Sequence, residues 1–148
     1  MHDAHCFLDG EYLRVSQARV SVLDRGFVFG DGVYEVVPVY DKRLFRFDEH
    51  MARLARSLLK LRIPNPATRD EWLARCRALV RAEAASDQVV YMQITRGVAP
   101  RDHVMPQGLV PTVFMMTNPM RSPSAEQRHQ GVACITASDF RWERGDIK

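Results

Sequence analysis

The segment GDGVYEVVPVYDKRLFR, residues 30–46, determines the fold, because it predicts a strand and a hairpin. Val33 to Tyr40 is a run of β-branched and aromatic residues, which predicts a buried strand. Asp41-Lys42 is a polar turn, so Arg43 to Arg46 is expected to pair back as a hairpin. Pro38 cannot donate a hydrogen bond to a neighbouring strand, and it therefore predicts an edge position or a bulge.

Two amphipathic helices are predicted directly after this hairpin. Asp48 can cap a helix from Glu49 to about Leu61, which Pro64 and Pro66 would end. Its apolar residues recur at helical spacing and form one face: Met51, Leu54, Ala55, Leu58 and Leu61. Thr68-Arg69-Asp70-Glu71 has the capping-box pattern and begins the second helix. That helix also has one apolar side, with Trp72, Leu73, Cys76, Leu79 and Val80.

Further strands are predicted on both sides of this unit. Cys6–Leu8 and Tyr12–Val15 flank Asp9-Gly10, which is typical of a β-hairpin. Val89–Arg96 and Thr112–Thr117 are predicted to be strands, with a loop from Gly97 to Pro111 between them, and a turn-rich stretch is predicted around Asp24-Arg25-Gly26. The order β-β-β-β-α-α-β-β predicts an α+β fold, a mainly antiparallel sheet with two helices on one face.

The end of the chain predicts the start of a second domain. Residues 118–124, NPMRSPS, are rich in proline and serine and favour a linker. The predicted organisation is a first domain over residues 1–117, this linker, and the beginning of a second domain over residues 125–148. A further strand is expected at Val132–Ala137.

Composition excludes several classes of protein. The 148 residues are 46% hydrophobic and 26% charged, and the net charge of +3 has no basic stripe that would suggest nucleic acid. No apolar run approaches the ~20 residues of a membrane span, so a cytoplasmic protein without membrane partners is expected. Cys6, Cys76 and Cys134 are far apart and predict reduced thiols, with no disulfide and no metal site.

Four segments in order resemble one family. They are DRGFVFGDGVYEVVPVY (24–40), FDEHMARL (47–54), TRGVAPRDHVMP (95–106) and RWERGDIK (141–148). Together they resemble the class IV (fold type IV) pyridoxal-phosphate aminotransferases, and within them the D-amino-acid (D-alanine) type. The resemblance implies a homodimer that uses pyridoxal 5'-phosphate to exchange amino groups between D-amino acids and 2-oxo acids.

The same resemblance implies roles for individual residues. Lys148 matches the lysine that forms the Schiff base with the cofactor and then moves a proton. Arg53 matches the arginine that binds the cofactor phosphate, an anion that a planar guanidinium suits well. Tyr34, Arg101 and His103 match a trap for the substrate α-carboxylate, in which the loop with Arg101 and His103 crosses from the neighbouring subunit.

Some alternatives stay open at this point. Gly30 and Gly32 are more typical of a tight turn than of a phosphate loop. Val36 is a candidate for pocket lining, whereas Glu35 and His50 have no assigned role. Family members continue beyond the lysine, so a chain ending at Lys148 is expected to be inactive alone. Either it is a true fragment, or a lysine–cofactor adduct interrupts the sequence there.

Two other functions compete with transamination. A lyase similar to aminodeoxychorismate lyase would share the Asp24-to-Tyr34 pattern and the lysine, but the Arg101-Asp102-His103 loop favours the aminotransferase. Branched-chain aminotransferases differ in the segment before the tyrosine strand. A truncated, non-catalytic domain that only dimerises is the third hypothesis.

Overall fold

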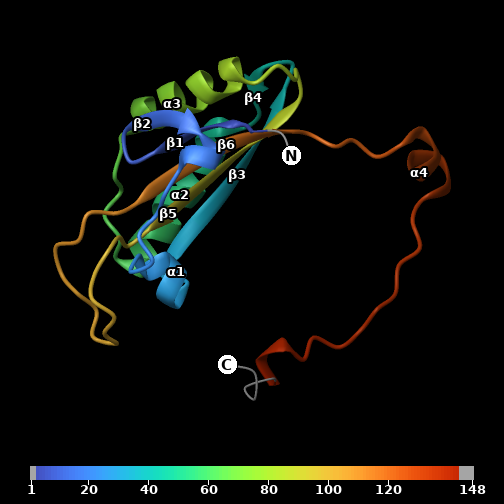
Figure 1. Cartoon of the computed structure of the whole chain (residues 1–148). Coiled ribbons are helices and arrows are strands. Elements are labelled where there is room, and N and C mark those ends of the chain that lie inside the picture. Colours follow the sequence, from blue (N-terminus) through green and yellow to red (C-terminus); the bar gives the residue numbers. More distant parts are fainter. Residues whose placement is uncertain (1–2, 144–148) are drawn as a thin grey trace.

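A computed structural model describes residues 3–143 of the chain. Six antiparallel strands form one sheet in the order β2-β1-β6-β5-β3-β4 (Figure 1). Their bounds are β1 His5–Leu8, β2 Glu11–Arg14, β3 Gly32–Tyr40, β4 Arg43–Leu44, β5 Gln88–Thr95 and β6 Val113–Pro119. The mainly antiparallel sheet predicted from the sequence is confirmed, as is the hairpin of β1 and β2.

The β3–β4 hairpin explains how a proline fits inside a strand. Asp41 and Lys42 both have left-handed backbone angles, with φ of 48° and 60°, which is what a two-residue hairpin turn requires. The Pro38 carbonyl accepts a hydrogen bond of 2.8 Å from the Phe45 amide, on the β4 side. Since the nitrogen and carbonyl of a strand residue face the same side, the Pro38 nitrogen points away from β5. The prediction of an edge position or a bulge is therefore wrong: β3 lies between β5 and β4 with unbroken pairing to β5, and the proline fits because its nitrogen faces away from that pairing.

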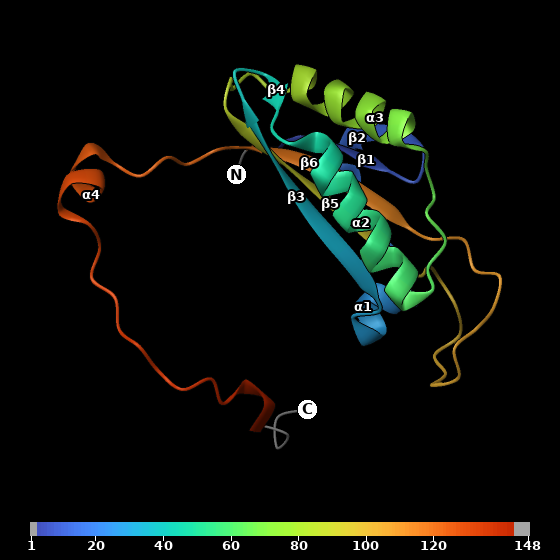
Figure 2. The ribbon, with the colours of Figure 1, turned by 180° about the vertical axis from the view of Figure 1, so that it is seen from behind.

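Two long helices, α2 (Phe47–Leu61) and α3 (Arg69–Ala82), lie on the same face of the sheet (Figures 1 and 2). The capping box of Thr68 and Glu71 is formed as predicted. The predicted cap by Asp48 is wrong, because α2 already begins at Phe47 after Arg46. Asp48 instead accepts a hydrogen bond of 2.7 Å from Arg69, which joins the first turns of the two helices.

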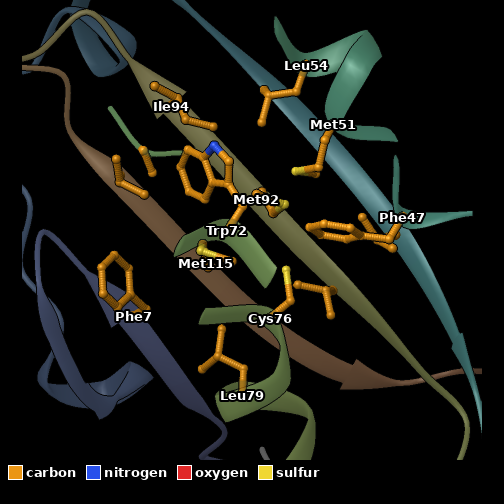
Figure 3. Packing of buried hydrophobic residues seen from close by; sticks show 14 of the residues in the cluster. Phe7, Phe47, Met51, Leu54, Trp72, Cys76, Leu79, Met92, Ile94 and Met115 are labelled. Atoms are coloured by element: carbon orange, nitrogen blue, oxygen red, sulfur yellow. The ribbon is translucent and has the colours of Figure 1, made fainter. Parts of the chain in front are cut away.

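The hydrophobic core fills the space between this face and the helices. Figure 3 shows Trp72 and Cys76 of α3 directed toward strand residues such as Met92 and Met115, with Leu54 of α2 beside them. Trp72 is 1% exposed, and its indole nitrogen donates to the Asn65 side chain at 3.1 Å. A buried aromatic whose N–H is satisfied stabilises the packing of helix on sheet without a polar penalty.

A short helix, α1 (Arg25–Phe29), replaces the turn expected around Asp24-Arg25-Gly26. The Asp24 side chain caps it by accepting from the Gly26 amide at 2.8 Å. Gly30 ends it in the left-handed region, with φ of 66°, and β3 begins two residues later. The glycine turn predicted to position the Tyr34 strand is thus the C-terminal end of a helix.

The last described part of the chain contributes nothing to this core. All residues from 121 to 143 are exposed, and they include a short helix, α4 (Ala125–Gln130) (Figure 1). The strand predicted at residues 132–137 is absent from this structure, because a strand needs a neighbour for its backbone groups and none lies beside it within residues 3–143. No helix among the described residues has the length and apolarity to cross a bilayer.

Candidate functional site

Arg53 and Glu35 form a two-point ion pair between α2 and β3. The Arg53 Nε donates to Glu35 Oε2 at 2.9 Å, and Nη2 donates to Oε1 at 2.5 Å. The Glu35 side chain is 3% exposed, whereas that of Arg53 is 60% exposed. Within residues 3–143 the Arg53 Nη1 donates no hydrogen bond, so the outer edge of the guanidinium remains available to an anion.

Glu35 lies on the covered face because of strand alternation. Glu35, Val37 and Val39 share the side that α2 covers, and all three are buried. Burial raises the pKa of the Glu35 carboxyl, but hydrogen bonds from Arg53, His50 and the Val36 amide outweigh it, so the net pKa is lowered. The carboxylate therefore stays charged at neutral pH and holds the guanidinium in one orientation.

His50 completes this cluster from the same helix. Its Nδ1 lies 3.0 Å from Glu35 Oε1. The same Nδ1 lies 3.3 Å from Arg53 Nη2, so His50 contacts both members of the ion pair. His50 and Arg53 are three residues apart on α2, a spacing that places both side chains on one side of the helix, over β3.

Tyr34 points to the opposite side of β3 and is 70% exposed. Its ring stacks on Tyr91 of β5, with centroids 6.0 Å apart. Because β3 is almost at the edge of the sheet, residues from both of its sides reach one open depression of about 540 Å³. That depression is lined by Tyr34, Glu35, Val36, Arg53 and Ser57.

Arg101 and His103 lie together elsewhere, in the loop between β5 and β6. Both contact the Phe29 ring of α1: the Arg101 Cζ is 5.3 Å from its centroid, and the His103 ring centroid is 5.7 Å away. His103 lines a separate cavity of about 570 Å³ with Phe29 and Met105 among others. No contact joins Tyr34 to Arg101 or His103 within the described part of one chain.

The structure thus brings Arg53 beside Tyr34 and Arg101 beside His103, as two separate groups. Lys148 lies outside the described residues, so its predicted place at the cofactor stays a prediction. Sequence reasoning missed the roles of Glu35 and His50. A carboxylate at an inward position of a buried strand was the available signal, because such a group requires a cationic partner.

Comparison with known proteins first defines the class. The fold is that of class IV aminotransferases: the branched-chain amino acid aminotransferase of Escherichia coli superposes with a TM-score of 0.76 and 26% identity, over 84% of this chain and 43% of that one. The 4-amino-4-deoxychorismate lyase of Pseudomonas aeruginosa gives a TM-score of 0.70 and 27% identity, over 86% of this chain and 44% of the lyase.

The sequence comparisons are more specific. The amino-transferase class IV family pattern matches residues 32–147, so the chain belongs to that family, whose members use pyridoxal phosphate. The chain is 42% identical over 140 residues to a D-alanine aminotransferase of Bacillus licheniformis, which covers 95% of this chain and 49% of the relative. The chain spans about half the length of the curated relatives it matches.

Proposed function

We propose that this chain supplies part of the active site of a pyridoxal-phosphate enzyme that exchanges amino groups between D-amino acids, such as D-alanine, and 2-oxo acids. The observation that carries the proposal is the exposed Arg53 guanidinium, held by a buried carboxylate beside Tyr34 in one depression. The resemblance to D-alanine aminotransferases along nearly the whole chain supports the same conclusion.

The residues around Arg53 suit the cofactor phosphate. A phosphate group carries about −1.5 to −2 charges near neutral pH and binds best to a preorganised fork of N–H donors. Glu35 occupies the inner edge of the guanidinium, which fixes its plane and leaves Nη1 directed outward. Bound pyridoxal phosphate would supply the aldehyde that condenses with amines and the ring that accepts electrons. In this proposal Lys148 provides the amine that holds the cofactor and moves the proton.

Arg101, His103 and Tyr34 would bind the substrate α-carboxylate. A guanidinium, an imidazole and a hydroxyl around one anion fix its orientation and so decide which hydrogen of the α-carbon faces the lysine. Arg101 and His103 lie near Phe29 and not near Tyr34 in the described chain. We therefore propose a homodimer in which this loop reaches Tyr34 of a second copy. Residues 125–148 would begin the second domain, after the linker predicted at 118–124, whose first two residues belong to β6.

A direct test uses the full-length gene product with D-alanine and 2-oxoglutarate. Pyruvate and D-glutamate should form, and L-alanine should give no pyruvate. Lys148→Ala should abolish the visible absorbance of lysine-bound cofactor. Pyruvate released from aminodeoxychorismate, without transfer from D-alanine, would instead support the lyase that the Pseudomonas aeruginosa similarity keeps as the second candidate. Absence of both activities and of cofactor binding would leave the non-catalytic hypothesis.

The phosphate role of Arg53 has a matched control on its own helix. Arg53→Met should raise the Kd for pyridoxal phosphate about 10- to 100-fold, the equivalent of one or two charge-assisted hydrogen bonds. Arg56→Met removes another exposed arginine of α2 and should leave that Kd unchanged. Equal effects of the two substitutions would contradict the assignment.

A further inference from the structure

The loop that carries Arg101 and His103 is held closed at its base by a buried carboxylate. Asp24 is 1% exposed. Its Oδ2 accepts from the hydroxyls of Thr95, at 3.0 Å, and Thr112, at 2.7 Å, which stand at the two ends of the loop. One side chain outside the loop therefore ties both ends together.

Close contact between the two arms of the loop adds to this constraint. Gly97 has φ of 104°, and a Cβ added there would lie 2.0 Å from the Val110 carbonyl oxygen. Only glycine permits both this backbone conformation and this approach. The Gly97 carbonyl also accepts from the Arg25 amide at 2.9 Å, so α1 contacts the loop directly after its base.

Arg25 reaches further, to the part of the loop between the two proposed substrate ligands. Its Nη1 donates to the Asp102 carbonyl at 3.1 Å, and Asp102 stands between Arg101 and His103 in the sequence. The Arg25 Cζ lies 4.7 Å from the centroid of the Phe29 ring that Arg101 and His103 also contact. The Arg25 side chain is only 8% exposed, which makes it a buried support and not a second ligand on the surface.

Asp31 orients Arg25 and connects it to the far end of α2. Asp31 Oδ2 accepts from Arg25 Nε at 2.8 Å and from Arg96 Nε at 2.7 Å. Arg96, whose side chain is 7% exposed, also donates to the carbonyls of Leu61 and Arg62 at the C-terminal end of α2. Hydrogen bonds from Arg96 and Arg25 lower the pKa of Asp31 against the effect of burial, so the carboxylate remains charged.

We propose that Arg25 is a positioning residue: through Asp31 and the Asp102 carbonyl it holds Arg101 and His103 at the spacing needed to bind one carboxylate. This inference rests on the proposed function. Two side chains bind one small anion well only when the backbone that carries them is fixed. Residues 100–105 of the loop are exposed. Among residues 3–143 that lie outside this segment, only Arg25 has a side chain that donates a hydrogen bond to its backbone.

The test compares Arg25→Met with Arg77→Met, an exposed arginine of α3, in the full-length gene product. Arg25→Met should speed amide hydrogen exchange in the loop, at residues 98–110, about 10- to 100-fold, which corresponds to the loss of charge-assisted hydrogen bonds. Amides of β5 and β6 should stay as protected as before. The KM for D-alanine should rise about tenfold, while the visible absorbance of lysine-bound cofactor and the Kd for pyridoxal phosphate stay unchanged. Arg77→Met should change neither the amide exchange rates of the loop nor the KM for D-alanine.

Two results would overturn the proposal: loop exchange as slow as in the unmodified protein, or a rise in KM that is matched by equal loss of cofactor binding. Arg25→Lys serves if the methionine variant does not fold, since lysine keeps the charge but cannot span Asp31 and Asp102 with one planar fork. An unmodified protein that transfers no amino group from D-alanine would contradict the proposed function alone. The exchange measurement would still decide whether Arg25 holds the loop.

Discussion

The two sides of strand β3 differ sharply in their surroundings: one side is packed into the core and the other is open. Val37 and Val39 face the helices and are completely buried, whereas Tyr34 and Tyr40 face the other way and are 70% and 48% exposed. Both long helices lie on the first side (Figure 2). Glu35 shares the buried side but is charged, and its partner Arg53 brings that charge to the surface. The covered face therefore supports the candidate site from below, and the open face supplies the exposed tyrosine.

Thiol reactivity should give the largest contrast between buried and exposed positions. Cys76 of α3 is buried between that helix and the sheet, and desolvation raises the pKa of its thiol to about 12. Cys134 is exposed. Since only the thiolate reacts, labelling at pH 8 should modify Cys134 at least about a thousandfold faster than Cys76. Mass spectrometry of the labelled chain measures this. Buried Cys6 should also react slowly, and all three thiols should react alike in urea.

Trp72, which α3 packs against the covered face of the sheet, should be the most costly core side chain to remove. Trp72→Ala should lower the free energy of unfolding by about 3–5 kcal/mol, because it leaves a cavity between α3 and the sheet and removes one of the two hydrogen bonds that the Asn65 Oδ1 accepts. Trp142, which is 97% exposed, is the matched control, and Trp142→Ala should change stability by less than about 0.5 kcal/mol. Urea unfolding followed by circular dichroism reports both. Similar losses for the two variants would contradict the core described above.

Glu35, the charged residue on the covered side of β3, should make the free energy of unfolding depend on pH. The pKa of Glu35 is lowered below its ordinary 4.5, so its contribution is fully present above that value and is lost as the pH falls through the folded-state pKa. Glu35→Gln should cost about 1–2 kcal/mol at pH 7, a modest figure because Arg53 is largely exposed.

The pH series separates this effect from simple loss of packing. The stability difference between Glu35→Gln and the unmodified chain should shrink when unfolding is measured at progressively lower pH below 4.5. Glu11→Gln, on an exposed part of β2, is the control and should show no such difference. A constant difference at every pH would mean that Glu35 acts through its shape alone.

Tyr34, on the open side of β3, should contribute least to the free energy of unfolding. Tyr34→Ser should lower the free energy of unfolding by only about 0.5 kcal/mol, because the tyrosine is mostly exposed already. Val37→Ala, three residues along on the covered side, should cost about 2 kcal/mol. The same urea experiments measure the two values. If Tyr34 proved as costly as Val37, the open face would have to be packed in solution.

The sequence by itself determined the local elements of this protein. The β-branched run of Val33–Tyr40, the Asp41-Lys42 turn and the helical spacing of apolar residues each depend on neighbours within a few positions, and the strand, the turn and the two helices appear in the structure. The strand is buried on one side only, whereas the run predicted a buried strand. Motif resemblance also identified Arg53, Tyr34, Arg101 and His103 as the residues to consider. A predicted strand at 132–137 failed, because a strand depends on a partner that lies elsewhere in the chain.

Only the tertiary structure decided which charged groups meet. Glu35 and Arg53 are 18 residues apart, and Arg96 and Asp31 are 65 apart, so no local pattern marks either pair. Folding brings each pair together because a buried carboxylate without a cationic partner would cost several kcal/mol. The residue types were visible in the sequence, but their orientation and burial arose from packing α2 and α1 against one edge of the sheet.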